Sequence, residues 1–393
     1  MVSSEFYTAD NSNLEDKKLE AAKNHYKTGD YQAALRLYLS MLTTNTSYKL
    51  YHRIGKCYYK IGDFDNAEEY FGKSAELEKY DNPSFYYLAN IKYKKEDLKS
   101  AIYYWACAFS SKPEDANISL NLATSYFSRG MRYQSVFYYE KYLKYANQSA
   151  ENYSAIKNSI DRYTQIGEEC LQKAKLALER KDNKTALEFL MFAVKNSPVD
   201  FNINYLLGCS YLEENDNMHA LIYLKQAYCL DPKSLDVIQR LASVYINLGD
   251  YTSAYCMMRR LLPLVIHNQE EYLKTMQVIK SLDSTFDELS YTGHKEWGDK
   301  YFDDNNYHFA LFEYENCTIL KEDMQQKLSD KIYQLKSFLN PESRIIRTSI
   351  ELGGKAYKDK DYKTSNKYFT KVLKLSSPDT SEYKLAKSRV VDV

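Results

Sequence analysis

One spacing constrains this chain more than any other feature of its sequence: in two runs of three, an alanine in a similar context returns every 33 or 34 residues. The contexts include YQAALRLY at 31–38, FDNAEEYF at 64–71, LKSAIYYW at 98–105 and YTSAYCMM at 251–258. A fixed period of this length is typical of helical repeat arrays, in which each unit buries its apolar face against its neighbours. The aligned alanines are Ala34, Ala67, Ala101, Ala186, Ala220 and Ala254.

The unit at 204–232 indicates how one repeat is built. Its apolar periodicity predicts two helices of roughly a dozen residues, NYLLGCSYLEEN and HALIYLKQAYCL. The small residues Gly208 and Ala220 allow the two helices to approach closely, and Pro232 suits the first turn of the next helix. In several units a Gly-Asp pair such as Gly249–Asp250 separates the helices, because glycine tolerates the positive φ that ends a helix. The predicted seam is formed by Leu207, Tyr211, Leu224 and Ala227.

The composition agrees with a helical chain and excludes several classes of protein. Among 393 residues there are only 12 glycines and 7 prolines, too few for the many tight turns of a β-sandwich or β-barrel. Lys plus Arg and Asp plus Glu both number 53, and the longest basic run, at 92–95, is short. We therefore expect neither nucleic-acid binding nor membrane insertion.

The cysteines and the N-terminus favour a cytoplasmic protein. The seven cysteines are odd in number, are scattered and form no CxxC pair, so we expect neither a disulfide framework nor a zinc site. The first residues lack the apolar core of a signal peptide, and the most apolar run, at 261–266, is too short to span a bilayer. The cysteines are Cys57, Cys107, Cys170, Cys209, Cys229, Cys256 and Cys317.

The repeated pattern resembles the tetratricopeptide repeat (TPR) family. The resemblance implies an all-α fold: a right-handed superhelical α-solenoid of about nine helix-turn-helix repeats. Trp297-Gly298 matches the Trp-Gly pair of the family, whereas Ser135 and Ser365 replace the packing alanine in units four and nine. The units begin near Glu15, Tyr48, Asn82, Ala116, Gly167, Phe201, Leu235, Tyr291 and Ile346.

The repeat register also predicts how the chain is divided. We expect a disordered N-terminus at 1–14, repeats 1–4 at 15–149 and repeats 5–7, with a lengthened first helix, at 150–267. An irregular or helical insertion follows at 268–290. Repeats 8–9, with a connecting helix, occupy 291–376, and a capping segment occupies 377–393. The array is expected to bend where these interruptions fall.

No catalytic or metal-binding constellation is evident in the sequence. The glycine-rich, zinc-protease and nucleophile-elbow motifs are absent. The six histidines fall in different units, and most carboxylates lie at positions typical of solvated helix faces. We predict that the chain is not an enzyme and that it holds no metal or cofactor; an enzyme is the least supported of the three functions considered.

The family resemblance implies a concave groove lined by the first helix of each unit. Its inward positions are the second, fifth, ninth and twelfth of the unit. The null alternative is that these tyrosines only fill gaps between neighbouring first helices. Carried over, the main partner-binding residues are Lys23, Tyr26, Lys49, His52, Lys56, Tyr59, Tyr86, Asn90, Tyr93 and Phe127. A second region contains Lys175, Asn202, Tyr205 and Gln239.

The predicted function is a protein-interaction scaffold or adaptor that captures a partner peptide or protein segment in this groove. The alternative is a self-assembling scaffold, a homo-oligomer that organises a larger complex. Chaperone-binding members of the family use a Lys and an Asn four residues apart in the first unit. Here Leu19 and Lys23 occupy those places, so binding of a chaperone tail is not supported.

Overall fold

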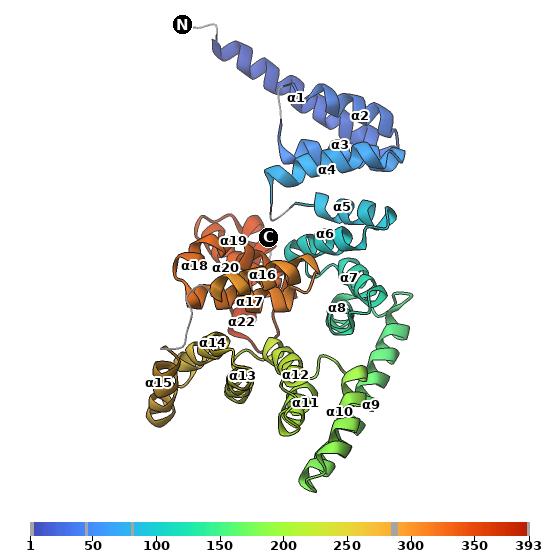
Figure 1. Cartoon of the computed structure of the whole chain (residues 1–393). Helices are drawn as coiled ribbons and strands as arrows, with labels where there is room; N and C mark the ends of the chain where they lie inside the picture. Colours follow the sequence, from blue (N-terminus) through green and yellow to red (C-terminus); the bar gives the residue numbers. More distant parts are fainter. Residues whose placement is uncertain (1–3, 44–45, 80–81, 284–289, 391–393) are drawn as a thin grey trace. The chain divides into compact units, whose positions relative to one another are not determined.

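Every secondary-structure element in the described part of the chain is a helix (Figure 1). The structure is a computed structural model that describes residues 4–43, 46–79, 82–283 and 290–390. It separates into two units, one formed by 1–113 with 348–393 and the other by 114–347. The all-α fold predicted from the sequence is confirmed.

The first unit begins with three helical hairpins and ends with the last helices of the chain. The helix α20, Pro341–Lys358, crosses from the second unit into the first. The other helices are α1 (Ser4–Lys27), α2 (Tyr31–Ser40), α3 (Tyr48–Ile61), α4 (Phe64–Leu77), α5 (Ser84–Lys94), α6 (Leu98–Ser111), α21 (Tyr362–Leu375) and α22 (Ser381–Arg389).

The second unit contains five further hairpins and the helices that connect them. Its first hairpins are α7 (Ala116–Ser128) with α8 (Arg132–Tyr145), α9 (Tyr153–Glu179) with α10 (Asn183–Asn196), α11 (Phe201–Glu213) with α12 (Asn217–Leu230), and α13 (Leu235–Asn247) with α14 (Tyr251–Leu261). They are followed by the 3-10 helix η1 (Leu262–Leu264), α15 (Gln269–Asp283), the hairpin of α16 (Tyr291–Asp303) and α17 (Tyr307–Leu320), α18 (Asp323–Lys327) and α19 (Ser329–Leu339).

The predicted domain boundaries stay predictions. They follow the repeat register, whereas the two units are defined by which residues lie close together. The helix α1 begins at Ser4, inside the segment 1–14 for which the sequence predicts disorder. The predicted insertion at 268–290 contains α15, and residues 284–289 lie outside the described part.

An aspartate caps the second helix of most hairpins. At α4, for example, the Asp63 carboxylate accepts a hydrogen bond from the backbone N–H of Asn66. The residue before the aspartate has a positive φ, which the sequence predicts to require glycine. Gly62 meets that expectation, but Glu96 and Lys181 adopt the same left-handed conformation. The cap therefore recurs more widely than the glycine does.

Close contact between the two helices of a hairpin explains the predicted seam glycine. A Cβ atom on Gly208 would lie 2.6 Å from Cγ of Leu224, and Ala220 is completely buried. The same contact recurs between Gly55 and Phe71. A larger side chain at these glycines would force the hairpin apart.

The substitution Gly208→Ala is therefore expected to lower the free energy of unfolding by about 1–3 kcal/mol, because the seam cannot accept a methyl group without moving. The control is Gly72→Ala on α4, where an added Cβ meets nothing within 4 Å. It is expected to raise stability by roughly 0.5–1 kcal/mol, because alanine favours helix. Urea unfolding can follow each unit through its own tryptophan, Trp297 for the second and Trp105 for the first. Equal effects of both substitutions would contradict the tight seam.

Within the second unit, the later hairpin packs onto the second helices of the earlier ones. The helix α17 contacts both α12 and α14. At the end of α7, the Tyr126 hydroxyl donates to the backbone carbonyl of Asn305 at 3.0 Å. On α8, Lys141 forms an ion pair of 2.8 Å with Glu342 at the start of α20. The second-helix faces of this unit are therefore partly covered, while α9, α11 and α13 carry the first-helix surface.

Candidate partner-binding surface

The first helices α1, α3 and α5 carry nine of the ten residues predicted for the main binding surface; Phe127 lies in the second unit. The central helix, α3, begins where the Ser47 hydroxyl accepts from the N–H of Leu50 and ends at Gly62, whose φ is 93°. Its buried face contains Leu50 and Ile54, so the opposite side is free to carry polar residues.

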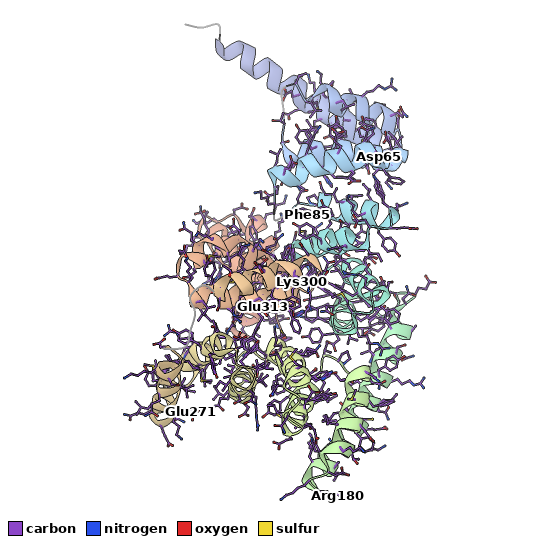
Figure 2. The ribbon with its side chains drawn as sticks, in the orientation of Figure 1. Asp65, Phe85, Arg180, Glu271, Lys300 and Glu313 are labelled. Atoms are coloured by element: carbon purple, nitrogen blue, oxygen red, sulfur yellow. The ribbon has the colours of Figure 1, made fainter. Side chains whose placement is uncertain are left out.

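Four cations form a stripe along α3, at spacings of four, three and four residues: Lys49, Arg53, Lys56 and Lys60. At 100° per residue they lie within about 60° of the helix circumference. Among the described residues, no carboxylate approaches any of them within 4.0 Å. By contrast, Lys95 on the next hairpin is paired with Asp65 at 2.6 Å and with Glu68 at 2.9 Å (Figure 2 labels Asp65). The stripe therefore presents positive charge that the described part of the chain does not neutralise.

Lys56 links this stripe to the aromatic residues of α1. Its ammonium nitrogen lies 4.7 Å from the centre of the Tyr26 ring, a cation–π contact. Burial, together with the neighbouring Lys60 and Arg53 cations, lowers the pKa of Lys56. Burial also raises the pKa of Tyr26. An incoming carboxylate would relieve the charge repulsion along α3.

Two of the predicted residues fill the space between neighbouring first helices. His52 Nδ1 lies 2.9 Å from the Ser84 hydroxyl on α5. Burial and the nearby Lys56 cation lower the pKa of His52 to about 4, so the ring is neutral at neutral pH. The Tyr59 ring packs edge-on against Tyr87, with the centres 5.3 Å apart. These contacts join α3 to α5 and leave less of both side chains for a partner.

The residues on α5 differ in how much of each side chain is available. Asn90 accepts a hydrogen bond from Trp105 Nε1 at 3.2 Å. Tyr93 is 53 % exposed although its ring lies 5.5 Å from that of Trp105, and Tyr86 is half-buried. On α1, Lys23 is paired with the exposed Glu20 at 3.0 Å. Lys49 and Tyr93 are the most accessible of the predicted residues in this unit.

The predicted second region lies on α9, α11 and α13 of the second unit. Gln239 donates to Glu271 on α15 at 2.6 Å, so its amide already has a partner (Glu271 is labelled in Figure 2). Tyr205 stacks on Phe201 with ring centres 6.0 Å apart. Asn202 is exposed and Lys175 is half-buried. These four residues are less clearly poised for a common ligand than the stripe on α3.

The hairpin that carries the stripe also decides the family. The profile described as "Tetratricopeptide repeat" matches residues 48–81, which contain α3 and α4. This chain is a tetratricopeptide-repeat protein. The family predicted from the sequence is thereby confirmed.

Relatives of this TPR protein are distant. A curated protein from Bos taurus, described as "BBSome complex member BBS4", is 22% identical over 258 residues, which are 61% of this chain and 49% of that protein. The match thus spans about half the length of this relative. The "TPR2AB-domain:pHSP90-complex of yeast Sti1" is 16% identical, covers 69% of this chain and 99% of its own, and has a TM-score of 0.30. The "P58(IPK) TPR Domain" is 14% identical, with coverages of 95% and 97% and a TM-score of 0.30.

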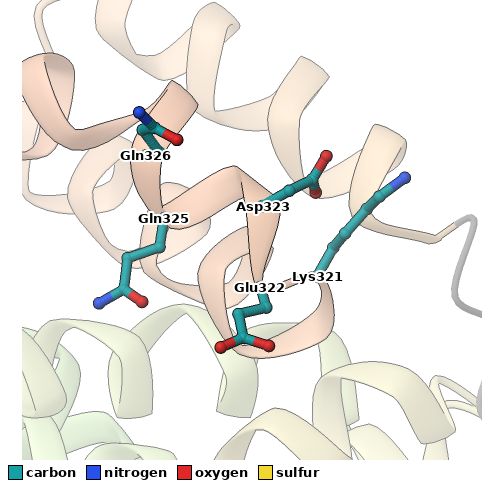
Figure 3. Close-up of a pocket in the computed structure, with 5 residues that line it drawn as sticks. All are labelled: Lys321, Glu322, Asp323, Gln325 and Gln326. Carbon is teal, nitrogen blue, oxygen red and sulfur yellow. The ribbon is translucent and has the colours of Figure 1, made fainter.

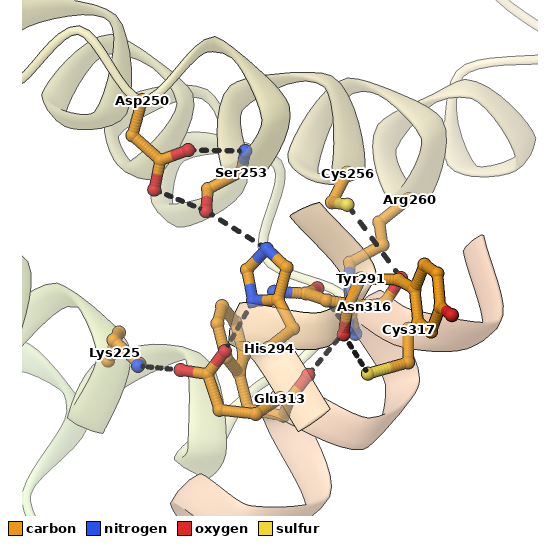
Figure 4. A network of polar contacts seen from close by, with 11 residues as sticks. Lys225, Asp250, Ser253, Cys256, Arg260, Tyr291, His294, Glu313, Asn316 and Cys317 are labelled. Carbon is orange, nitrogen blue, oxygen red and sulfur yellow. Dashed lines mark hydrogen bonds and ion pairs between the residues drawn. The ribbon is translucent and has the colours of Figure 1, made fainter. Parts of the chain in front are cut away.

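One cluster of the TPR protein has the spacing of a serine–histidine–acid triad (Figure 4). The Ser253 hydroxyl lies 3.3 Å from His294 Nε2, and His294 Nδ1 lies 2.7 Å from the Glu313 carboxylate. However, the Ser253 hydroxyl donates to Asp250, the cap of α14, at 2.6 Å, and Ser253 is 1% exposed. Its proton is therefore already committed, and the residue has almost no contact with solvent. The cluster joins α12, α14, α16 and α17.

Other features of the repeats give little support for small-molecule chemistry. Among the described residues, no group of three or more His, Cys, Asp or Glu side chains could hold a metal ion. A hollow of about 730 Å³ lies beside the short helix α18; Figure 3 shows its side chains spread around the helix rather than enclosing a common centre. The lining residues are Lys321, Glu322, Asp323, Gln325 and Gln326. No helix in the described ranges combines the length and apolar character needed to cross a membrane.

The sequence analysis missed two members of the stripe and the whole buried cluster. Arg53 and Lys60 fall outside the four inward positions carried over from the TPR family. Their four- and three-residue spacing from Lys49 and Lys56 was the available signal. Glu313 gave no signal, because its partners Lys225 and His294 are 88 and 19 residues away in sequence.

Proposed function

We propose that this chain is a protein-interaction scaffold whose α1–α3–α5 surface binds an acidic segment of a partner protein. The observation that carries the proposal is the cationic stripe on α3, which has no carboxylate partner among the described residues. Lysines supply charge for Asp or Glu side chains, and the adjacent tyrosines supply flat contact area at low conformational cost. The TPR fold supports an interaction role in general, since stacked repeats present extended binding surfaces.

We also propose that the partner belongs to a multiprotein assembly in which this chain is a subunit. The distant bovine relative carries the description "BBSome complex member", which supports membership in a complex of some kind. A scaffold that holds acidic segments of other subunits fits such a place. The proposal involves no catalytic step.

The test reverses the charge of the stripe. The triple variant Lys49→Glu, Lys56→Glu and Lys60→Glu is expected to weaken capture of the partner by roughly 30- to 100-fold, and wild-type binding is expected to weaken as salt rises. The control changes three exposed lysines on the second helix α21: Lys363, Lys367 and Lys374 to Glu. Co-purification from the native cell with mass spectrometry identifies the partner, and its affinity for each variant is then measured.

Three outcomes distinguish the alternatives once circular dichroism has shown unchanged helicity. A partner lost only from the α3 variant supports the proposed surface. A partner that both variants retain contradicts it. If the only protein recovered is the chain itself, and light scattering shows mass rising with concentration, self-assembly replaces the proposal.

A further inference from the structure

The hairpin of α9 and α10 is unequal in length. The helix α9 has 27 residues and α10 has 14, and the first buried residue of α9 is Gly167. The C-terminal half of α9, which ends near Arg180 (labelled in Figure 2), packs against α10. The N-terminal half, 153–166, extends beyond the end of α10. Its apolar side chains therefore lack the second helix that covers them in an ordinary repeat.

Those side chains form one wall of a pocket of about 520 Å³ inside the second unit. On α9 they are Ile156, Ile160 and Tyr163, at spacings of four and three residues. The facing helix α8 contributes Val136 and Tyr139, also on one side of the helix. Between other hairpins the neighbouring helices pack directly, whereas here two apolar rows face an open space.

The apolar surface continues beyond the pocket. Phe127, at the end of α7, is 65% exposed and Tyr163 is 49% exposed, and both line the pocket. A small ligand inside the pocket would leave much of these two rings in water. A longer apolar surface, such as one face of a helix, would cover them as well.

One end of the pocket is positively charged. Arg132 and Lys195 line it, and no Asp or Glu is among its lining residues. Arg132 donates one hydrogen bond to the backbone carbonyl of Lys195 at 3.0 Å. Across the described ranges, neither cation has a carboxylate within 4.0 Å. The charges of the pocket therefore complement an acidic occupant.

We propose that this pocket binds an amphipathic helix of another protein. The apolar face of that helix enters between α8 and α9, and its acidic residues meet Arg132 and Lys195. Side chains three and four residues apart on the bound helix would fit between the two apolar rows, as ridges fit into grooves. The site uses none of the residues of α1, α3 or α5, so it is a second docking site, separate from the proposed acidic-segment surface.

The first experiment selects peptides of about 16 residues, long enough for a helix, from a displayed random library on the full-length chain. The same selection is made on the Ile160→Glu variant and on the milder Ile160→Ala, with unchanged unfolding followed through Trp297. We expect a set of peptides that depends on Ile160, with bulky apolar residues three or four apart and with Asp or Glu beside them. No such set, or a set without either feature, overturns the proposal.

The second experiment measures the affinity of one recovered peptide, labelled with fluorescein, by anisotropy. Lys195→Glu is expected to weaken binding roughly tenfold. Lys184→Glu, on the same helix but outside the pocket, is expected to have no effect. Equal effects of these two substitutions overturn the charge match. A concentration-dependent dimer that Ile160→Glu abolishes would identify a second copy of this chain as the occupant and would also overturn the proposal. The α3 triple variant should bind the peptide normally, so this test stands or fails separately from that of the proposed function.

Discussion

Replacing Glu313 by alanine is expected to lower the free energy of unfolding of the second unit by about 3–5 kcal/mol, because the substitution leaves Lys225 buried without its counter-charge. The two side chains are each 7% exposed, and the Lys225 ammonium donates to Glu313 at 2.6 Å. Burial alone would raise the pKa of Glu313, but Lys225 and His294 together hold it below its ordinary value of 4.5. The carboxylate therefore contributes stability above about pH 4.5, and this contribution is lost as the pH falls further.

The measurement is urea unfolding in a Trp105→Phe background, in which Trp297 is the only tryptophan and reports the second unit. The matched control is Glu270→Ala, which breaks an exposed pair with Lys274 and should change nothing measurable. The double variant Lys225→Met with Glu313→Leu should recover much of the loss, because an apolar pair needs no desolvation of charge. If Glu313→Ala matched the control, the pair would not hold α12 and α17 together.

Acidification from pH 7 to pH 5 is expected to cost the second unit about 2 kcal/mol through His308 alone. Burial lowers the pKa of His308 to about 4 from its ordinary value of 6.5, and its ring packs edge-on against Tyr133 and Phe137. The unfolded chain takes up a proton below pH 6.5 that the folded chain refuses until about pH 4. The stability from the neutral ring is therefore complete above pH 6.5 and is lost as the pH falls toward 4.

The variant His308→Gln isolates this contribution. Whatever its stability at pH 7, its unfolding free energy should fall less steeply between pH 7 and pH 5 than that of the wild type. His267→Gln, at an exposed position, should follow the wild-type curve. The pH range lies above that in which the buried carboxylates titrate. Parallel curves for His308→Gln and the wild type would show that the ring is protonated in the folded protein.

The fold could be predicted to the level of the single hairpin, and the reason is local. Gly208 lies against Leu224, only 16 residues further along, so the spacing of small and apolar residues carries the contact. The packing of α17 onto α12 and α14 could not be predicted in the same way. Lys225 and Glu313 resemble charges of a solvated helix face in sequence, and only the tertiary fold makes them buried partners.

The candidate surface shows the same limit. The carried-over positions identified Lys49 and Lys56 but could not separate residues that face a partner from those that join two helices. His52 needed its hydrogen bond to Ser84 to be recognised as part of the α3–α5 contact. Arg53 was missed because unneutralised charge is a property of the surroundings. A spacing rule contains no information on which carboxylates come near.

The covering of second helices by a later hairpin also has a consequence for synthesis on the ribosome. In an open repeat array each unit meets only its neighbours, so it can fold as soon as the next one emerges. Here α8 forms its ion pair between Lys141 and Glu342, which lie 201 residues apart. At 5–20 residues per second, α8 waits roughly 10–40 s for that partner. During this time the nascent chain exposes an apolar face that the finished protein hides, so vectorial synthesis favours a holding chaperone at this stage.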